Sequence, residues 1–480
     1  MKEKIVIIGA GIAGLSLANK LLSKGYQVTL VEKNNEVGGL CSGYFVNGHY
    51  IDACIHWLMG TNKNSDLYKY WSEVGAFNSE LKFISLPTLG SYEYQNTTIT
   101  FYRDIEKTRK ELLDLSPKDE KNINLFIDSV KQMAVVMGLV QGYKDRDYKK
   151  SLRKIKKYPH IIKSMRYSKE EYASRFTHPA IRFALQNCQT GYNNMFFFLD
   201  LYGLFIKDNA DVPSGGAYYM VQRMKDKFLS LSGELLLNTQ ALELVVNKRK
   251  ISILKTDKGD IVGDRFVSCL DANYTLSHLS NNKYKVRRFI KAEKNIENEP
   301  ISSCYNLYIT VKGDMSDIDV PTGLNIHPIK VGDHFTDFLL VRPYHFDSCF
   351  IKDNKTVVSL FIDQNHHDYQ YFKSLNEEEY QKEINNINLS LINAFIERYP
   401  QFKDKVEILD YFSPVELEKR TNSKYGAIQA YSFTNKSMFH IYNGKVRGLK
   451  NFYLCSQWNR SIGGTPTALL TAISVSKKFK

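Results

Sequence analysis

The amino-acid sequence predicts an α/β fold with two domains, one built on a parallel sheet and the other an α+β domain of mixed sheet and helices. Near the start, a β-branched run at 5–8 leads directly into a glycine-rich turn and then into apolar residues at helical spacing. Later, 81–102 and much of 276–414 read as strands. A length of 480 residues, 43% of them hydrophobic, allows two sizeable cores.

The glycine-rich turn has the form G-x-G-x-x-G. Gly9 permits the turn, Gly11 lets a pyrophosphate approach the backbone, and Gly14 lets the helix pack closely on the strand. The free N–H groups at the helix N-terminus favour phosphate. A second strand at 27–31 ends at Glu32, whose carboxylate can bind ribose hydroxyls. The spacing predicts a dinucleotide-binding βαβ unit; the alternatives are an ordinary glycine-rich turn and a signal peptide.

Just beyond this acid, Gly38, Gly39 and Ser42 resemble the two-domain flavoproteins that include amine oxidases and phytoene desaturases, in which a Gly-Gly pair lies over the FAD diphosphate. The resemblance implies FAD as the cofactor, with Leu40 where that group usually has Arg. In this part of the chain the implied cofactor-binding residues are Gly9, Gly11, Ile12, Ala13, Gly14, Glu32, Lys33, Gly38, Gly39, Leu40 and Cys41.

The segment 48–61 reads as an alternating strand followed by His56 and Trp57. It is similar to a segment that passes near the flavin in bacterial relatives of retinol saturases and carotenoid isomerases, and Asp52 and His56 match that pattern. The resemblance makes His56 the candidate catalytic residue. The alternative is a hydrogen-bonded histidine in the core.

Four distant segments extend the resemblance. The turn at 213–216 is similar to one that returns the chain to the FAD domain, 233–246 to a strand pair whose backbone near Ala241 and Leu242 holds the adenine, and 266–272 to the next strand. The last segment, 448–478, reads as a strand, a glycine turn and a helix whose N-terminus would face the flavin. Its implied cofactor contacts are Gln457, Trp458, Gly463, Gly464 and Thr465.

The resemblance also implies the domain limits. Segments 1–75, 208–275 and 415–480 would form a discontinuous Rossmann-like FAD-binding domain, and 76–207 and 276–414 a substrate-binding domain. Within the second domain we expect helices that begin at Ser116-Pro117 and at Met195, and a long helix around 384–395.

The formal net charge of +14 suggests an anionic partner. The segment Lys144–Lys169 contains eleven Lys or Arg and two Asp, with apolar residues at helical spacing. It is therefore a candidate contact for an anionic membrane surface, the alternative being a solvated helical face. Nucleic acid is not expected, because aromatic interleaving and a known binding module are both missing.

Seven cysteines without a C-x-x-C pair predict neither a zinc site nor a disulfide framework. No apolar run reaches the length of a membrane span. We therefore expect a cytoplasmic protein, peripheral on the inner face of the membrane if the basic segment binds there. The run Asn365-His366-His367-Asp368 lacks a second pair of ligands, so no metal is expected.

Together these features predict an FAD-dependent oxidoreductase of the phytoene desaturase, carotenoid isomerase and retinol saturase group. It would desaturate, saturate or isomerise C–C or C=C bonds of a hydrophobic isoprenoid, carotenoid-like or lipid substrate by hydride transfer with flavin N5, with NAD(P)H or a quinone as electron partner. The alternatives are an amine oxidase with Trp57 and Trp458 as an aromatic cage, a non-catalytic basic membrane-surface binder, and a cysteine hydrolase using Cys41 in its G-x-C-x-G context.

Overall fold

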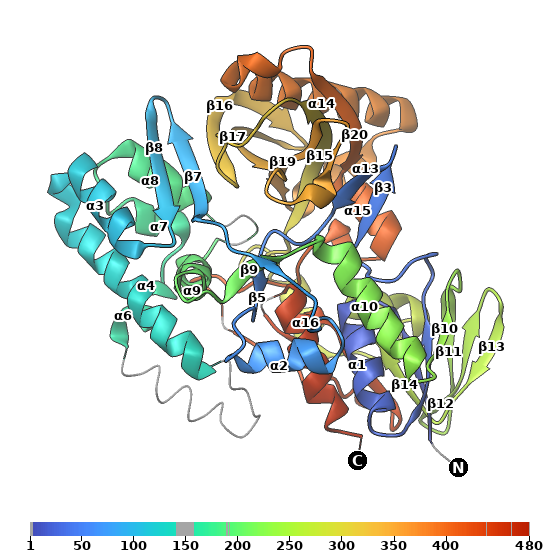
Figure 1. The fold of residues 1–480 in the computed structure, drawn as a ribbon. Coiled ribbons are helices and arrows are strands. Elements are labelled where there is room, and N and C mark those ends of the chain that lie inside the picture. The colour runs from blue at the N-terminus through green and yellow to red at the C-terminus, as the bar shows by residue number, and fades with distance from the viewer. Residues whose placement is uncertain are drawn as a thin grey trace.

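The computed structural model describes residues 3–140, 158–188, 191, 193–437, 439–461 and 463–479. Figure 1 shows a sheet with helices near the two termini, a larger sheet at the top and a group of helices on the left. Among the described residues, no helix combines the length and hydrophobicity needed to cross a bilayer.

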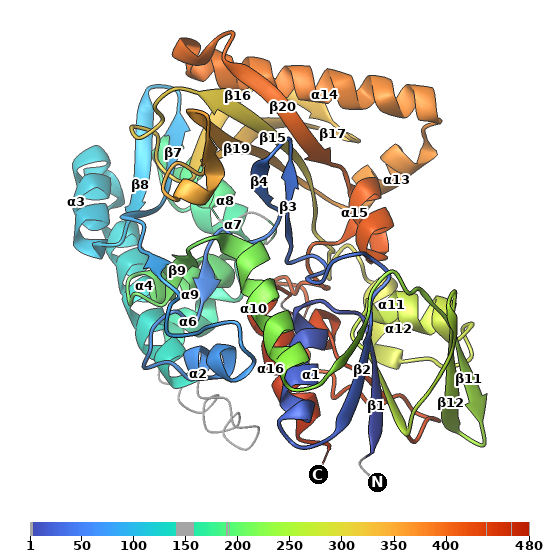
Figure 2. The same cartoon turned by 45° about the vertical axis from the view of Figure 1, so that its right-hand side comes forward.

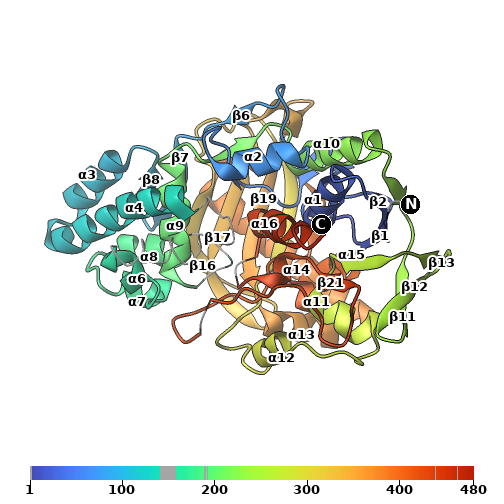
Figure 3. The same cartoon turned by 90° about the horizontal axis from the view of Figure 1, so that it is seen from below.

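The dinucleotide-type sheet has five parallel strands in the order β10-β2-β1-β14-β21. Its strands are β1 (Lys4–Ile8), β2 (Gln27–Val31), β10 (Glu234–Leu236), β14 (Arg265–Ser268) and β21 (Phe452–Leu454). The helices α1 (Ile12–Leu22), α10 (Gly216–Ser230) and α16 (Thr465–Ser476) pack together on this sheet, as the view from below shows (Figure 3). Ile5 and Ile7 pack on one face in the core formed with these helices, and Val6 packs on the other face with residues between 241 and 292, so all three are fully buried. The predicted βαβ unit is confirmed as a fold element.

A three-stranded antiparallel sheet lies at the outer side of this region (Figure 2). It consists of β11 (Ala241–Asn247), β12 (Lys250–Thr256) and β13 (Gly259–Val262). Three short helical elements follow β14: α11 (Ala272–Tyr274), the π-helical turn Thr275–Leu279 and α12 (Arg287–Glu293).

The larger sheet has eight strands, seven in the order β20-β15-β19-β17-β16-β7-β8, with β18 paired to β19. They are β7 (Thr88–Tyr94), β8 (Thr97–Tyr102), β15 (Ser303–Lys312), β16 (Thr322–Val331), β17 (His334–Pro343), β18 (Ile351–Lys352), β19 (Lys355–Gln364) and β20 (Val406–Phe412). The long helix α14 (Glu377–Arg398) covers one face (Figure 1) and contributes Ile384, Ile387 and Leu391 to the core there. The helix α13 (His366–Ser374) and the 3-10 turns Ser348–Phe350 and Pro400–Phe402 complete this region.

A group of helices adjoins β7 and β8. It comprises α3 (Ile105–Leu115), the 3-10 turn Pro117–Asp119, α4 (Glu120–Val140), α6 (Pro159–Ser164), α7 (Lys169–Ala173), α8 (Pro179–Asn187) and α9 (Met195–Phe205). The helix α9 is buried almost all round, and Phe198 on it stacks on Phe126 of α4 with ring centroids 6.3 Å apart. Residues 144–157 of the predicted basic segment lie outside the described residues.

Short elements join these parts. They are β3 (Gly43–Val46), β4 (His49–Asp52), β5 (Leu58–Met59), α2 (Asp66–Glu73), β6 (Phe83–Ile84), β9 (Ala210–Pro213), α15 (Pro414–Thr421) and the 3-10 turns Lys424–Gly426 and Gln457–Asn459. Two buried acids fix the start of α10: Asp347 accepts from the Gly215 N–H at 2.8 Å, and Asp52 accepts from the Ala217 N–H at 2.7 Å. A side chain on Gly216 would collide with the Asp52 carboxylate, since a Cβ there would lie 2.0 Å from Oδ2. These contacts hold α10 against the segment that carries Asp52.

Candidate active site

The first glycines of the chain form a tight turn between β1 and α1. Gly9 has φ +98°, which favours glycine. A Cβ on Gly14 would lie 1.9 Å from the Gly9 carbonyl oxygen, so only glycine allows this approach of helix to strand. The helix α1 has no side-chain cap at its N-terminus. Its first N–H groups therefore remain available to an anion.

The Gly-Gly pair lies directly on this turn. The Gly38 N–H donates to the Ala10 carbonyl at 2.9 Å, and Gly11 and Gly38 form an isolated parallel bridge. Gly38 and Gly39 have φ values of +118° and +61°. Two glycine segments 27 residues apart in the chain, at 11 and 38, thus line one side of a single cleft.

Glu32 is fixed at the end of β2. Its Oε2 accepts from the Ala10 N–H at 2.9 Å and its Oε1 from the Asn34 N–H at 3.0 Å. Burial raises the pKa of the Glu32 carboxyl, while these two backbone hydrogen bonds act in the opposite direction. Each carboxylate oxygen keeps acceptor capacity for a further donor, such as a ribose hydroxyl.

The cleft formed by these elements has a volume of about 170 Å³. It is lined by most of the residues predicted to bind the cofactor: Gly9, Gly11, Ile12, Ala13, Glu32, Lys33, Gly38, Gly39, Leu40, Cys41, Ala241, Gln457, Trp458, Gly464 and Thr465. Three predicted residues do not line the cleft. Gly14 packs beneath it, Gly463 lines the neighbouring cavity, and Leu242 is 48% exposed to solvent.

Two further residues of the cleft were missed by sequence reasoning. Arg420 comes from α15, donates to the Ser42 hydroxyl at 2.6 Å and lies over the rings of Tyr44 and Phe412. Asp271 accepts from the Lys424 N–H at 2.7 Å, and burial raises its carboxyl pKa to about 6. The signal for Asp271 was its position after β14, at the carboxyl edge of the parallel sheet. Nothing local marks Arg420, which is 378 residues from Ser42 in the chain.

A second cavity of about 880 Å³ adjoins the cleft. The two share part of their lining, namely Gly39, Leu40, Cys54, Arg420, Thr421, Ile428, Gly464 and Thr465. The rest of the large cavity is mostly apolar, with Met133 and Val136 from α4, Phe197 and Leu201 from α9, and Phe361 from the large sheet. A ligand that lies in the cleft can therefore extend one end into an apolar chamber.

The N-terminus of α16 borders this junction. Gly464, with φ +91°, precedes the helix, which has no side-chain cap, and the Gly464 N–H donates to the Gln457 side chain at 2.7 Å. A Cβ on Gly463 would lie 2.7 Å from the Ala430 nitrogen, so this turn packs directly on the segment before it. Thr465 and Thr467 line the large cavity.

His56 lines the large cavity as well. Among the described residues its Nδ1 has no hydrogen-bond partner, and burial, together with the nearby Arg342 charge, holds the pKa of the imidazole well below its usual value. The ring is therefore neutral at physiological pH. A catalytic role for His56 stays a prediction.

The structure bears on two alternative activities. Trp57 lines the large cavity, whereas Trp458 lines the cleft and makes an edge contact with Tyr431, so the two rings do not form one cage.

Cys41 is buried, and its hydrogen bond with Cys54 together with burial raises the pKa of its thiol well above the usual value. A nucleophilic cysteine needs the opposite shift.

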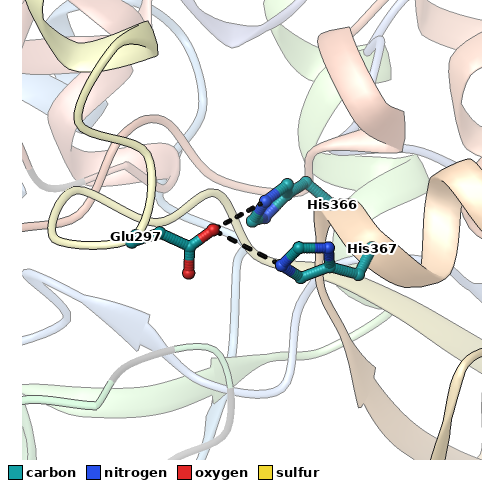
Figure 4. A group of neighbouring side chains, drawn as sticks. All are labelled: Glu297, His366 and His367. Atoms are coloured by element: carbon teal, nitrogen blue, oxygen red, sulfur yellow. Dashed lines mark ion pairs between the residues drawn. The ribbon is translucent and has the colours of Figure 1, made fainter.

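A cluster of possible metal ligands lies apart from the lining of both cavities (Figure 4). Glu297 pairs with His366 Nε2 at 3.2 Å and with His367 Nε2 at 3.4 Å. Among the described residues the His366 Nδ1 has no partner, unlike in most metal sites, where the second ring nitrogen donates to an orienting group. Burial lowers the pKa of His366, so a hydrogen bond from its neutral ring to the Glu297 carboxylate accounts for that contact without a metal ion.

Comparison with known proteins agrees with this geometry. Residues 7–74 match the family model described as an NAD(P)-binding Rossmann-like domain. A 1-hydroxycarotenoid 3,4-desaturase from a Flavobacterium species is 22% identical over 98% of this chain and 97% of its own. An oxidoreductase from Methanosarcina mazei has a similar structure, with TM-score 0.63, 13% identity and coverage of 99% and 100% of the two chains. A putrescine oxidase structure gives TM-score 0.59 at 12% identity, with coverage of 100% and 99%.

The fold and the family model show a mixed α/β protein with a Rossmann-like dinucleotide-binding domain, and the relatives support an enzyme of the oxidoreductase class. Within that class, the chain is similar to the phytoene desaturase-like group of the amine oxidase-like flavoproteins, as its motifs predicted. The predicted fold class and the prediction of an enzyme are confirmed.

Proposed function

We propose that this protein is an FAD-dependent oxidoreductase that desaturates, saturates or isomerises C–C or C=C bonds of a long apolar substrate of isoprenoid or lipid type. The observation that carries the proposal is the junction of two cavities, in which the dinucleotide cleft leads into an apolar chamber of about 880 Å³. The carotenoid desaturase named above matches the chain over nearly its whole length, which supports a substrate of this kind.

The residues present fit FAD. The carboxylate of Glu32 can accept from the adenosine ribose, and the uncapped N-terminus of α1 with Gly11 can hold a diphosphate. The lining shared by the two cavities then continues past Gly39 to the N-terminus of α16. The planar ring system of FAD would then lie along this shared lining, between the cleft and the large cavity.

Bound FAD supplies the capacity to take or give a hydride. The chain's own residues orient the substrate and exclude water. The walls contributed by α4, α9 and the large sheet are apolar, so a hydrocarbon segment can lie against the ring end of the cofactor without water. The N-terminus of α16 places its positive dipole end at the same junction, where it stabilises negative charge.

The test begins with the purified protein and its visible spectrum. We expect bound flavin, bleached by NADPH or dithionite without oxygen and reoxidised by a polyene faster than by air. Reduction by amines with release of hydrogen peroxide would support an amine oxidase instead. A protein that neither contains flavin nor takes up added FAD would refute the proposal.

We also propose that the basic segment Lys144–Lys169 attaches the enzyme to an anionic membrane surface, from which an apolar substrate can be drawn. Its excess of Lys and Arg supports this. Neutralising Lys149, Lys150, Lys154 and Lys157 together should reduce sedimentation with phosphatidylserine vesicles and leave flavin content unchanged. Unchanged sedimentation would contradict the proposal.

A further inference from the structure

A buried guanidinium lies in the wall of the large cavity. Arg342, near the end of β17, is only 5% exposed and lines the cavity. Among the described residues Arg342 forms no ion pair, although the Asp52 carboxylate attracts it at longer range, and its single hydrogen bond runs from Nη1 to the His56 carbonyl at 3.4 Å. A guanidinium has five N–H donors and remains charged at neutral pH. A charge buried with so few partners is strongly unfavourable unless a ligand completes its hydrogen bonds.

The register of the sheet shows which neighbours share its face. Arg342 lies opposite Ser359, which lies opposite Tyr308, so the three side chains form one row across β17, β19 and β15. The next row contains Leu340, Phe361 and Asn306. Tyr308, Asn306, Leu340 and Phe361 also line the cavity. The wall therefore changes from a polar row to a more apolar one within the distance between alternate residues of a strand, about 7 Å.

The polar groups beside Arg342 are hydrogen-bonded to one another and to the Asp52 backbone. The Ser359 hydroxyl donates to Asn306 at 2.6 Å, the Asn306 amide donates to the Tyr308 hydroxyl at 2.8 Å, and that hydroxyl donates to the Asp52 carbonyl at 3.2 Å. The Asp52 carboxylate is occupied by backbone N–H groups and by the Tyr50 hydroxyl. Within the row of Arg342, Ser359 and Tyr308, the donors that remain unused belong to the guanidinium.

We infer that the ligand of this cavity is an apolar chain that ends in a carboxylate, and that Arg342 binds this carboxylate. The inference rests on the proposed function, because it takes the cavity to be the substrate site. A planar carboxylate matches the guanidinium fork in a bidentate pair, and its single negative charge matches the one cation that the sheet contributes to the lining. Arg342 is then a residue that determines specificity, because a pure hydrocarbon would leave it desolvated and unpaired.

Ligand binding without turnover tests this inference. The fluorescence of cis-parinaric acid, a polyene carboxylate, is titrated at pH 8 against that of its methyl ester, with the flavin-containing protein as purified. We expect the acid to bind roughly 10- to 100-fold more tightly, the range for a hydrogen bond to a charged group. Arg342→Gln should remove this preference by weakening the acid alone, and Arg342→Lys should retain part of it.

Tyr308→Phe is the matched control, because it removes a hydroxyl from the same row and leaves the cation. It should keep the preference for the acid. Equal binding of acid and ester by the unmodified protein would overturn the inference, even if Arg342→Gln did not fold, and so would an acid preference that survives Arg342→Gln. Displacement of the probe by hexadecyl phosphate at lower concentration than by palmitate would replace the carboxylate with a phosphate and overturn the assignment.

The same samples separate this inference from the proposed function. Flavin content and reduction by NADPH are measured by absorbance, independently of the fluorescent ligand. An Arg342-dependent acid preference in a protein without flavin would refute the proposed oxidoreductase chemistry and support the ligand assignment. A flavin that reacts with hydrocarbon polyenes, in a protein that does not distinguish acid from ester, would overturn the assignment alone.

Discussion

Gly11 and Gly14 belong to one turn, but different partners constrain them. A Cβ on Gly14 would lie 1.9 Å from the Gly9 carbonyl oxygen, whereas the nearest atom to a Cβ on Gly11 is 3.6 Å away. Gly11 also has φ −73°, which any residue can adopt. The fold itself requires glycine at 14, while at 11 the space is left for a ligand.

Alanine substitutions separate these two requirements. Gly14→Ala should lower the free energy of unfolding by about 3 kcal/mol or more, because backbone must move to relieve the contact. Gly11→Ala should unfold close to the temperature of the unmodified protein without FAD, but should bind FAD more weakly. Calorimetry with and without FAD measures both effects. Equal destabilisation by the two substitutions would contradict this interpretation.

Asp200 lies on α9 and lines the large cavity, and its buried Oδ1 has no hydrogen-bond partner in the part of the chain that the structure describes. Burial raises the pKa of this carboxyl to about 7. An Asp in the unfolded chain titrates near 3.9, so between about pH 4 and pH 7 the folded state holds the extra proton. The contribution of Asp200 to the free energy of unfolding therefore falls as pH rises from about 4 to 7, and it is lowest above pH 7.

Replacing Asp200 by Asn should remove this pH dependence. At about 1.4 kcal/mol per pKa unit, the Asp200→Asn protein should gain roughly 3 to 4 kcal/mol relative to the unmodified protein between pH 4 and pH 8. Urea unfolding at pH 4.5, 6 and 8 measures the difference. If the two proteins lose stability in parallel as pH rises, Asp200 is not a buried acid of this kind.

At the scale of the element, α15 connects the large sheet to the dinucleotide cleft. Ser413 caps it by accepting from the Glu416 N–H at 3.3 Å, and the Ser413 hydroxyl also lies 2.6 Å from the Tyr380 hydroxyl on α14. The last turn of α15 carries Arg420 to Ser42 beside the cleft. The Ser413 cap thus helps to determine where the Arg420 guanidinium lies beside the dinucleotide cleft.

We expect Ser413→Ala to cost about 1 to 2 kcal/mol of stability and to weaken FAD binding, because the helix that carries Arg420 loses its cap. Asn376→Ala is the control, since Asn376 also caps a helix, α14, by accepting from the N–H three residues on, and does not line the cleft. It should destabilise similarly and leave FAD affinity unchanged. Chemical unfolding and FAD titration of both variants give the answer. A similar loss of FAD affinity in the two would contradict a specific role for α15.

At the scale of the whole molecule, the cleft is assembled from distant parts of the chain. Its lining comes from the first βαβ unit, the start of β11, the end of β14, α15 and α16. A dinucleotide there contacts all of these at once. Binding should therefore stabilise the complete fold and not one segment.

FAD added to the flavin-free protein at about 100 times its dissociation constant should raise the free energy of unfolding by about 2.7 kcal/mol. Riboflavin, which lacks the adenosine diphosphate half, should have a much smaller effect, because the Glu32 and α1 contacts are then unused. Thermal unfolding monitored by circular dichroism makes the comparison. Stronger stabilisation by NAD⁺ than by FAD would contradict the proposed cofactor.

Much of the cleft was predictable because its conformation is encoded locally. Positive φ at Gly9 and Gly38, and the close approach at Gly14, each demand glycine at a fixed place within a short motif. The helices that begin after Ser116 and at Met195 were also predicted, since caps and apolar spacing are local signals. The bounds of β16 are harder to predict, because it contains Pro328 and a register irregularity between Asn325 and Ile329, which obscure the alternation expected of a strand.

The amino-acid pattern was thus enough for the dinucleotide turn, the acid that follows β2 and the glycine pair above them, because short-range sterics dictate these residues wherever the motif occurs. Tertiary structure alone placed Arg420 beside Ser42 and buried Arg342 in the cavity wall without an ion-pair partner among the described residues. An arginine in a strand resembles any surface arginine until sheet register and burial show which face it shares. The energetic cost of burying such a charge arises only when the chain packs, so the sequence pattern does not reveal it.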